Sequence, residues 1–415
     1  MIQHKVKAAS LPSKFNFALC VMLSAVVCLR HALGISIPLP VVSLLSIIVV
    51  ATSLTAKISV CMPVICFILI YALTLILHPS PETWLRTQRF IAFVIGMTCF
   101  SPLIISDTLK KSREWIAASM YVILSLMVIL SFAIWGICLI ISGDEGIWTP
   151  IFHHYGFCGV FEMGMVLSPV AAITAIVTAW LLIDKTRQIS PFLGSILLGI
   201  SIVMCAVGGS RAALGGMALS LLVLLYLHRK AIISRLTKKS AILTTTAGIL
   251  VLIAVVPPAM TIIKHKTAIS ESHGSLFYSR KELWDNRIRE FKSSPLLGIG
   301  YANELPSSKD SPIDLTEIEP GSSWLSLLSY GGVIGTASFL VFAAVLIKRL
   351  VNIRHNNRDF PFYLSLLLFM TVNASTEGWL MFAGSLMFPI FWLTATAIWT
   401  TGIPVAPNQF HTKNE

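Results

Sequence analysis

The sequence predicts an all-α, polytopic membrane protein with one large loop outside the membrane. Of its 415 residues, 55% are hydrophobic and only 12% are charged, and the mean hydropathy is +0.81. These values lie outside the range of soluble globular domains. The chain also contains a series of apolar runs, most of them close to the roughly 20 residues that a membrane-spanning helix needs. A third observation is the uneven placement of lysine and arginine between the runs, which orients such a chain in a bilayer.

The apolar runs predict about twelve membrane-spanning helices. They cover residues 15–36, 38–56, 60–77, 88–106, 116–141, 163–183, 192–209, 212–227, 241–263, 324–347, 362–382 and 384–403. A polar stretch separates the ninth run from the tenth. We therefore expect transmembrane helices 1–9 within 1–263, a loop domain at 264–322, transmembrane helices 10–12 within 323–403 and a tail at 404–415.

Positive charges predict that both termini are cytoplasmic. If the N-terminus is inside, 19 of the 31 lysines and arginines lie in cytoplasmic segments and four in short external ones. The other eight lie in the long loop, which is exempt from the rule that positive charge stays inside. The net charge of +12 mostly reports this bias. It indicates membrane lipids as partners rather than nucleic acid.

A lone arginine stands between two apolar runs. Arg211 follows Gly208-Gly209-Ser210 and precedes Gly215-Gly216. A charge this close to hydrocarbon costs about 2.5–3.5 kcal/mol on insertion scales, so it usually faces a cavity or an anionic partner. The flanking glycines allow close approach of helices and of a ligand. We expect Arg211 to bind substrate.

The long loop supplies three further arginines on a predicted helix. Ser279 and Glu282 have the spacing of a capping box, which starts a helix there. One face of that helix then carries Arg280, Trp284, Arg287 and Phe291. The helix N-terminus adds a favourable pole for an anion. Together with Arg289, these guanidinium groups suit a lipid-linked phosphate or diphosphate.

Two alternative interpretations stay open. The loop helix is equally consistent with a solvated amphipathic helix whose arginines pair with Glu282, Asp285 and Glu290. The other external segment, 142–162, carries His153-His154, and His154 is a candidate contact for a polar ligand. Packing of that aromatic segment at the membrane interface is the simpler explanation.

Known metal and cofactor patterns are absent from the sequence. No Walker loop, zinc ligand set or dinucleotide fingerprint is present, so we expect neither a metal nor a cofactor. Seven of the eight cysteines lie within predicted spans, and only Cys158 lies in an external loop. This placement implies no disulfide framework.

Three features stand in order along the second half of the chain. The first is Ser210-Arg211 opening a span. The second is Arg280, then Trp284, then the segment 294–301 with sequence Ser-Pro-Leu-Leu-Gly-Ile-Gly-Tyr. The third is the re-entry into the membrane at 323–335, with Gly331-Gly332 inside it. In these features and in its topology the chain resembles the O-antigen ligase and polymerase superfamily of bacterial envelope glycosyltransferases.

The resemblance implies a metal-independent, inverting transfer in the bacterial inner membrane. The donor would be an undecaprenyl-diphosphate-linked glycan, and the acceptor a lipid-linked glycan or lipid A-core. Arg211 and Arg280 would hold the diphosphate, with Arg287 or Arg289 assisting. A chain-length regulator would be a further partner.

One departure from the family bears on the type of enzyme. Ligases of this family carry a His-Asn pair just before the re-entry helix, and here that position holds Gly321-Ser322. The nearby proton acceptors are Glu317 and Glu319, of which Glu319 is the candidate base. This departure favours a polymerase over a ligase. A lipid-linked glycan transporter or flippase, and a non-catalytic assembly protein, are the alternatives from other classes.

Overall fold

The computed structural model describes most of the chain. The described residues are 11–32, 34–54, 58–79, 83–146, 152–153, 156–184, 190–233, 278–305, 321–354 and 357–401. The predicted span 241–263 lies outside them, as do the candidate residues His154 and Glu319.

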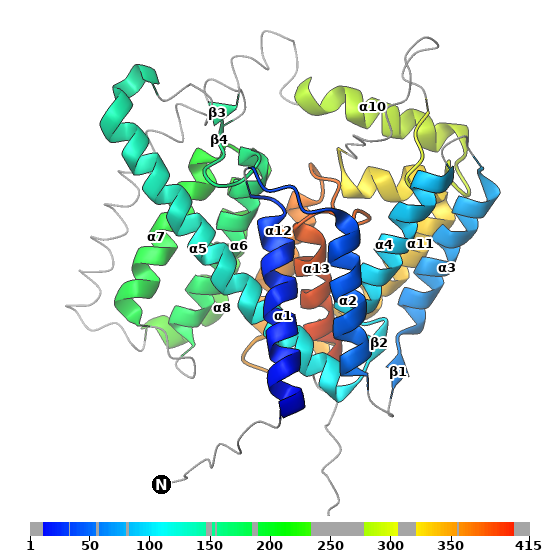
Figure 1. The fold of residues 1–415 in the computed structure, drawn as a ribbon, viewed down its shortest axis with the longest axis horizontal. Helices are drawn as coiled ribbons and strands as arrows, with labels where there is room; N and C mark the ends of the chain where they lie inside the picture. Colours follow the sequence, from blue (N-terminus) through cyan, green and yellow to red (C-terminus); the bar gives the residue numbers. More distant parts are fainter. Residues whose placement is uncertain are drawn as a thin grey trace, which may run out of the picture.

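The described chain is almost entirely helical, as predicted (Figure 1). Its helices are α1 (Leu11–Leu29), α2 (Leu39–Ser53), α3 (Met62–Leu77), α4 (Thr83–Phe100), α5 (Asp107–Gly146), α6 (Gly164–Ile183), α7 (Pro191–Val207), α8 (Arg211–Ile233), α10 (Tyr278–Ser293), α11 (Ser323–Asn352), α12 (Phe360–Asn373) and α13 (Met387–Thr400). Two short antiparallel pairs complete it: β1 (Ser59–Val60) with β2 (Ile104–Ile105), and β3 (Phe152–His153) with β4 (Gly156–Phe157).

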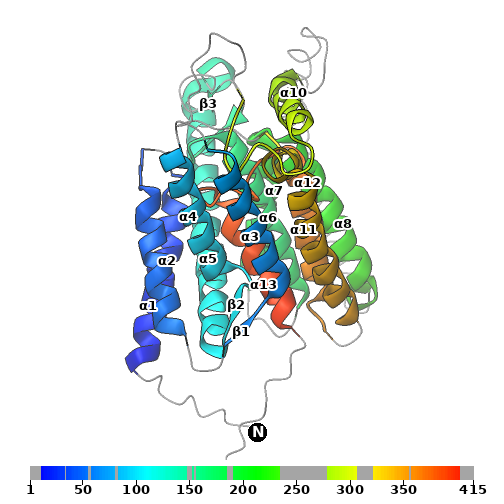
Figure 2. The same cartoon turned by 90° about the vertical axis from the view of Figure 1, so that its right-hand side faces the viewer.

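The long helices stand side by side, and α10 lies across one end of the bundle (Figures 1 and 2). We call this the α10 end. The β1–β2 pair and the start of α1 lie at the opposite end (Figure 1). The α10 end therefore gathers the polar residues of α10 and the loops that join neighbouring helices there.

The bundle has the dimensions and surface of a membrane protein. Four described helices are long and apolar enough to cross a membrane, namely α5, α6, α8 and α11. Six shorter apolar helices accompany them. Large apolar side chains such as Leu69, Ile76 and Leu222 are exposed on the outside of the bundle. A surface of this kind needs lipid to cover it. The count of about twelve spans stays a prediction.

Helix α11 is broken at Gly332, and the break explains why a glycine stands there. Gly332 has a φ of +59°, a left-handed conformation that favours glycine. The segment after α10 pairs with the broken turn: Ile299 N donates to Ser329 O at 2.8 Å and Val333 N to Pro295 O at 2.8 Å. The segment 295–300 thus satisfies backbone groups that the helix break leaves unpaired. It also ties α10 firmly to α11.

One predicted span was wrong in its second half. The apolar run 362–382 was expected to be a single helix, but α12 ends at Asn373 and the chain is irregular from 374 to 386 before α13 begins. The reason is the polar sequence Asn373-Ala-Ser-Thr-Glu-Gly inside the run. Small polar residues and glycine compete with helical hydrogen bonding. The irregular segment lies at the α10 end and carries Glu377.

Candidate functional site

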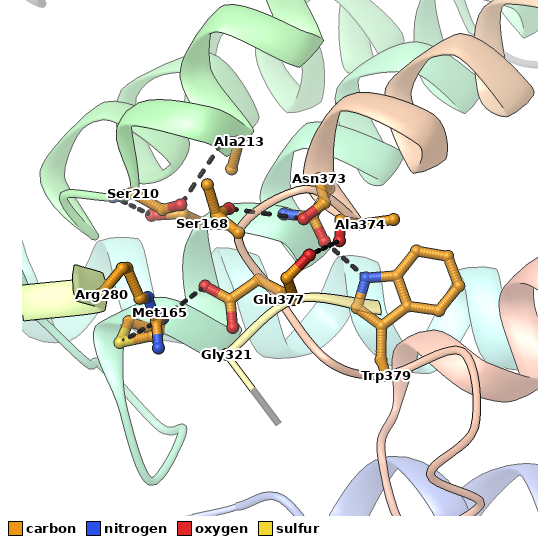
Figure 3. Close-up of polar contacts among 12 residues, drawn as sticks. Met165, Ser168, Ser210, Ala213, Arg280, Gly321, Asn373, Ala374, Glu377 and Trp379 are labelled. Atoms are coloured by element: carbon orange, nitrogen blue, oxygen red, sulfur yellow. Dashed lines mark hydrogen bonds and ion pairs between the residues drawn. The ribbon is translucent and has the colours of Figure 1, made fainter. Parts of the chain in front are cut away.

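Arg280 lies in the first turn of α10 and points toward the bundle (Figure 3). Its Nη2 atom forms an ion pair with Glu377 Oε1 at 2.9 Å, and the same nitrogen contacts Met165 Sδ on α6 at 3.7 Å. The two charged side chains are 12% and 22% exposed, so a polar ligand can reach the pair from outside. The face of α10 predicted to carry Arg280, Trp284 and Arg287 does turn toward the protein.

Arg211 opens α8 and is exposed at the same end. The turn before it is held against α6, because Ser210 N donates to Ser168 Oγ at 3.2 Å. Ser210 Oγ in turn accepts from Ala213 N at 3.3 Å, which caps the helix. A methyl group added at Gly208 would lie 2.5 Å from Ser168 Oγ, so the glycine permits this close packing.

The two arginines are therefore held around one turn of α6. Met165 contacts Arg280, and Ser168, three residues later, contacts the turn that leads into Arg211 (Figure 3). Residues three apart share one face of a helix. Arg280 and the turn that leads into Arg211, which are distant in sequence, thus contact the same part of α6.

Helix N-termini reinforce the positive potential of the site. Helices α6, α8, α10 and α11 all begin around it, at Gly164, Arg211, Tyr278 and Ser323. The N-terminus of a helix carries about half a positive elementary charge and exposes backbone N–H groups. Such ends favour phosphate groups. The electrostatic character of this region suits an anion that carries more than one negative charge.

Glu377 is a site residue that sequence reasoning missed. It lies in the irregular segment after α12, where the backbone carbonyl of Glu377 accepts from Ser323 N at 3.0 Å and from Ser323 Oγ at 2.7 Å. The same segment is fixed by Trp379 Nε1, which donates to Asn373 Oδ1 at 2.8 Å. A signal was present, because this carboxylate interrupts an apolar run. An ionisable residue inside such a run is a functional-site candidate by default.

Gly321-Ser322, where ligases carry His-Asn, has a structural role here. Ser322 caps α11 by accepting from Leu325 N. Gly321 has a φ of +70°, and a Cβ atom at this position would lie 2.8 Å from the Cβ of Leu283 on α10. Its carbonyl accepts from Trp284 Nε1 at 3.2 Å. The backbone at 321 thus has neither the conformation nor the space for a histidine.

Arg287 is engaged with carboxylates of its own. Its side chain is 3% exposed, forms an ion pair with Glu290 at 2.9 Å and another with Glu304, and lies over the ring of Tyr330. Burial alone would lower the pKa of Arg287, but Tyr330, Glu290 and Glu304 outweigh it and the pKa is raised.

Glu290 links this cluster to the broken helix. Its carboxylate accepts from Ser329 Oγ at 2.5 Å and from Leu305 N at 3.2 Å. Burial raises the pKa of Glu290, and the charge of Arg287 opposes that shift. The cluster fixes α10 on α11, so the structure gives Arg287 a role in positioning. Arg289 is exposed on the outer face of α10.

The described residues contain no group of three or more histidine, cysteine, aspartate or glutamate side chains placed to hold a metal ion. A cavity of about 840 Å³ lies between α5, α6, α12 and α13, and none of the candidate arginines lines it. Its lining includes Lys110 and Asp359, which belong to the opposite end of the bundle. The charged residues at the α10 end, and not the cavity volume, define the candidate site.

The fold and the site together define a class of protein: an all-α membrane protein that gathers arginines and a carboxylate where several helices begin. Residues 195–340 match the family model described as O-antigen ligase. This match confirms, for residues 195–340, the resemblance to the O-antigen ligase and polymerase superfamily. The chain is therefore a membrane enzyme of the glycosyltransferase type. No curated protein matches the chain significantly.

Proposed function

We propose that the enzyme polymerises undecaprenyl-diphosphate-linked oligosaccharide repeats at the periplasmic face of the bacterial inner membrane, with both termini in the cytoplasm. The observation that carries this proposal is that Arg280 and the turn that leads into Arg211 both contact one turn of α6. Members of the superfamily take a lipid-diphosphate glycan as donor. Two guanidinium groups at the edge of an apolar bundle suit such a molecule, whose charged head lies at the membrane surface and whose tail lies in lipid.

The chemistry needs little beyond positioning and charge. Diphosphate is already a good leaving group, so the arginines need only hold it and stabilise the charge that develops on the departing oxygen. The planar fork of arginine binds phosphate in a bidentate way, which the ammonium group of lysine does not. Helix N-termini around the site add to the same stabilisation.

Arg287 and Arg289 have lesser parts in this proposal. Arg287 is buried against two carboxylates, so it supports the position of α10 rather than the diphosphate. Arg289 faces outward and would contact only the more distant parts of a large glycan.

The geometry at Gly321 favours a polymerase over a ligase. Ligases of the superfamily use a histidine at this position, and here the positive φ of residue 321 and the contact with Leu283 disfavour any side chain. O-antigen ligase activity, with transfer to lipid A-core, is the second candidate because the matching family model has that description.

Purified protein in nanodiscs tests the proposal. With a lipid-diphosphate repeat as the only glycan, a polymerase gives a ladder of products of increasing length. With lipid A-core added, a ligase gives a single transfer product. Transport of the glycan across sealed vesicles without any new glycosidic bond would favour the flippase alternative and remove the proposal.

Variants test the role of the arginines. Arg211→Ala and Arg280→Ala should each lower the rate by about 10²-fold or more, as for loss of a group that stabilises a transition-state charge. Lysine at either position should restore only part of the rate. Arg229→Ala, at the far end of α8, is the matched control and should leave the rate unchanged. Normal polymer from either site variant would remove the diphosphate-binding role.

A further inference from the structure

We infer that Glu377 is the general base that activates the acceptor hydroxyl, and that the arriving diphosphate releases it from Arg280. This inference rests on the proposed function. It assigns the base to a residue outside the segment 195–340 that matches the family model.

Position is the first argument. The carboxylate lies 2.9 Å from Arg280, one of the two arginines proposed to hold the leaving group. A general base must come within hydrogen-bond reach of the proton that it takes, and Glu377 can meet an acceptor hydroxyl once Arg280 has turned away from it to the diphosphate. Glu290, a buried carboxylate at this end, is already engaged by Arg287 and Ser329. Glu377 is 22% exposed and can be reached by a sugar.

Rigidity is the second argument. The carbonyl of Glu377 accepts two hydrogen bonds from Ser323, the first residue of α11. The neighbouring Trp379 is 3% exposed and bonded to Asn373. A catalytic group must be held within about 0.5 Å of its productive position. Ser323 directly follows Gly321-Ser322, the pair that stands where ligases carry a histidine. Its hydrogen bonds to the Glu377 carbonyl therefore place Glu377 next to that position.

The ion pair suggests an order of events. Without donor, Arg280 pairs with the Glu377 carboxylate at 2.9 Å. A lipid diphosphate carries more negative charge than one carboxylate and competes for the same guanidinium group. When Arg280 turns to the diphosphate, the Glu377 carboxylate is released from this ion pair and is available to the acceptor hydroxyl. The base is then active only when donor is bound.

The transfer step balances as follows. The carboxylate of Glu377 takes the proton from the acceptor hydroxyl, and the acceptor oxygen forms a bond to the anomeric carbon of the donor sugar. The bond from that carbon to the diphosphate oxygen breaks, and its electron pair leaves with the lipid diphosphate. The anomeric configuration inverts, and Glu377 later gives its proton to water.

Azide separates a base from a purely structural ion pair. Azide attacks an anomeric carbon without losing a proton, so it needs the diphosphate site but no base. Glu377→Ala should lose transfer to a sugar by about 10²-fold or more, as for loss of a general base. It should still convert donor and azide into glycosyl azide at the wild-type rate. A carboxylate that merely orients Arg280 predicts equal losses in both reactions, and that result would overturn the inference.

Further variants make the test sharper. Glu377→Gln should lower kcat by about 10²-fold while leaving the KM for donor within about twofold, and Glu377→Asp should recover part of the rate. Glu162→Gln is the matched control, because Glu162 is another carboxylate at the α10 end that interacts with an arginine, Arg30. It should leave the rate unchanged.

The inference and the proposed function fail in different ways. If Arg211→Ala and Arg280→Ala are inactive but Glu377→Gln polymerises normally, the inference alone is wrong. If the arginine variants are as active as wild type, the diphosphate site is wrong and the inference falls with it.

Discussion

Replacing Gly298 with alanine should destabilise the protein by an amount that the structure allows to be worked out. Gly298 lies in the segment that pairs with the broken part of α11 and has a φ of +69°. A Cβ atom there would lie 2.5 Å from the carbonyl carbon of Tyr330 and 2.6 Å from the nitrogen of Gly331. Both are backbone atoms, so no rotation of a side chain relieves the overlap.

Two costs add to give the expected magnitude. Alanine in a left-handed conformation costs about 1–2 kcal/mol. Moving the segment away from α11 breaks two backbone hydrogen bonds, from Ile299 N to Ser329 O and from Gly300 N to Tyr330 O. Each of these contributes about 0.5–1.5 kcal/mol net. We therefore expect a loss of about 2–5 kcal/mol, with α10 and Arg280 displaced as well.

Thermal unfolding of the purified protein in detergent measures the effect, with tryptophan fluorescence as the signal. Gly215→Ala is the matched control, because no atom lies within 4 Å of an added Cβ on this turn of α8. Alanine in a helix is favoured over glycine by about 1 kcal/mol, so the control should melt at the same temperature or higher. If Gly298→Ala melts with the wild type, the segment does not support the broken helix as described.

Three more predictions concern Gly321, the orientation of the chain in the membrane and the absence of a metal requirement. Gly321→His should lower stability, through its contact with Leu283 and its positive φ, and should give no transfer to lipid A-core; a gain of that transfer in a product assay would contradict the argument. Single cysteines at Ser275 and Ser307, in a background without native cysteines, should react with impermeant maleimide in intact cells, whereas labelling only after the inner membrane is opened would reverse the orientation. Polymerisation in EDTA should proceed at an undiminished rate, and a rate that needs added magnesium would rule out a metal-independent transfer.

The positions of the helices, and the face of α10 that turns inward, could be predicted from the sequence. Apolar runs predicted most of the described helices to within several residues, because hydrophobic length is a property of the segment itself. The 3.6-residue period placed Arg280, Trp284 and Arg287 on one inward face of α10. The placement of Arg211 and Arg280 at the same end of the bundle followed from the topology.

Features that depend on tertiary contacts were not predictable from the sequence. Averaged hydropathy concealed Glu377, because one carboxylate barely changes the mean of a 21-residue apolar run. The burial of Arg287 in an ion-pair cluster depends on Glu304, which lies 17 residues further along the chain and contacts it only in the folded structure. The break in α11 at Gly332 likewise follows from the pairing with residues 295–300, which lie far from it in the sequence.

The division of the site between separate parts of the chain has a consequence for its evolution. Arg211 and Arg280 lie within residues 195–340, while Met165 and Glu377 lie on either side of that segment. A lipid diphosphate is common to the donors of this superfamily, whereas the accepting sugar differs from one polysaccharide to another. Selection can therefore hold the middle of the chain constant and let the flanking segments diverge. A chimera that exchanges only the middle segment between two such enzymes should keep the linkage made by the enzyme that supplies the flanks.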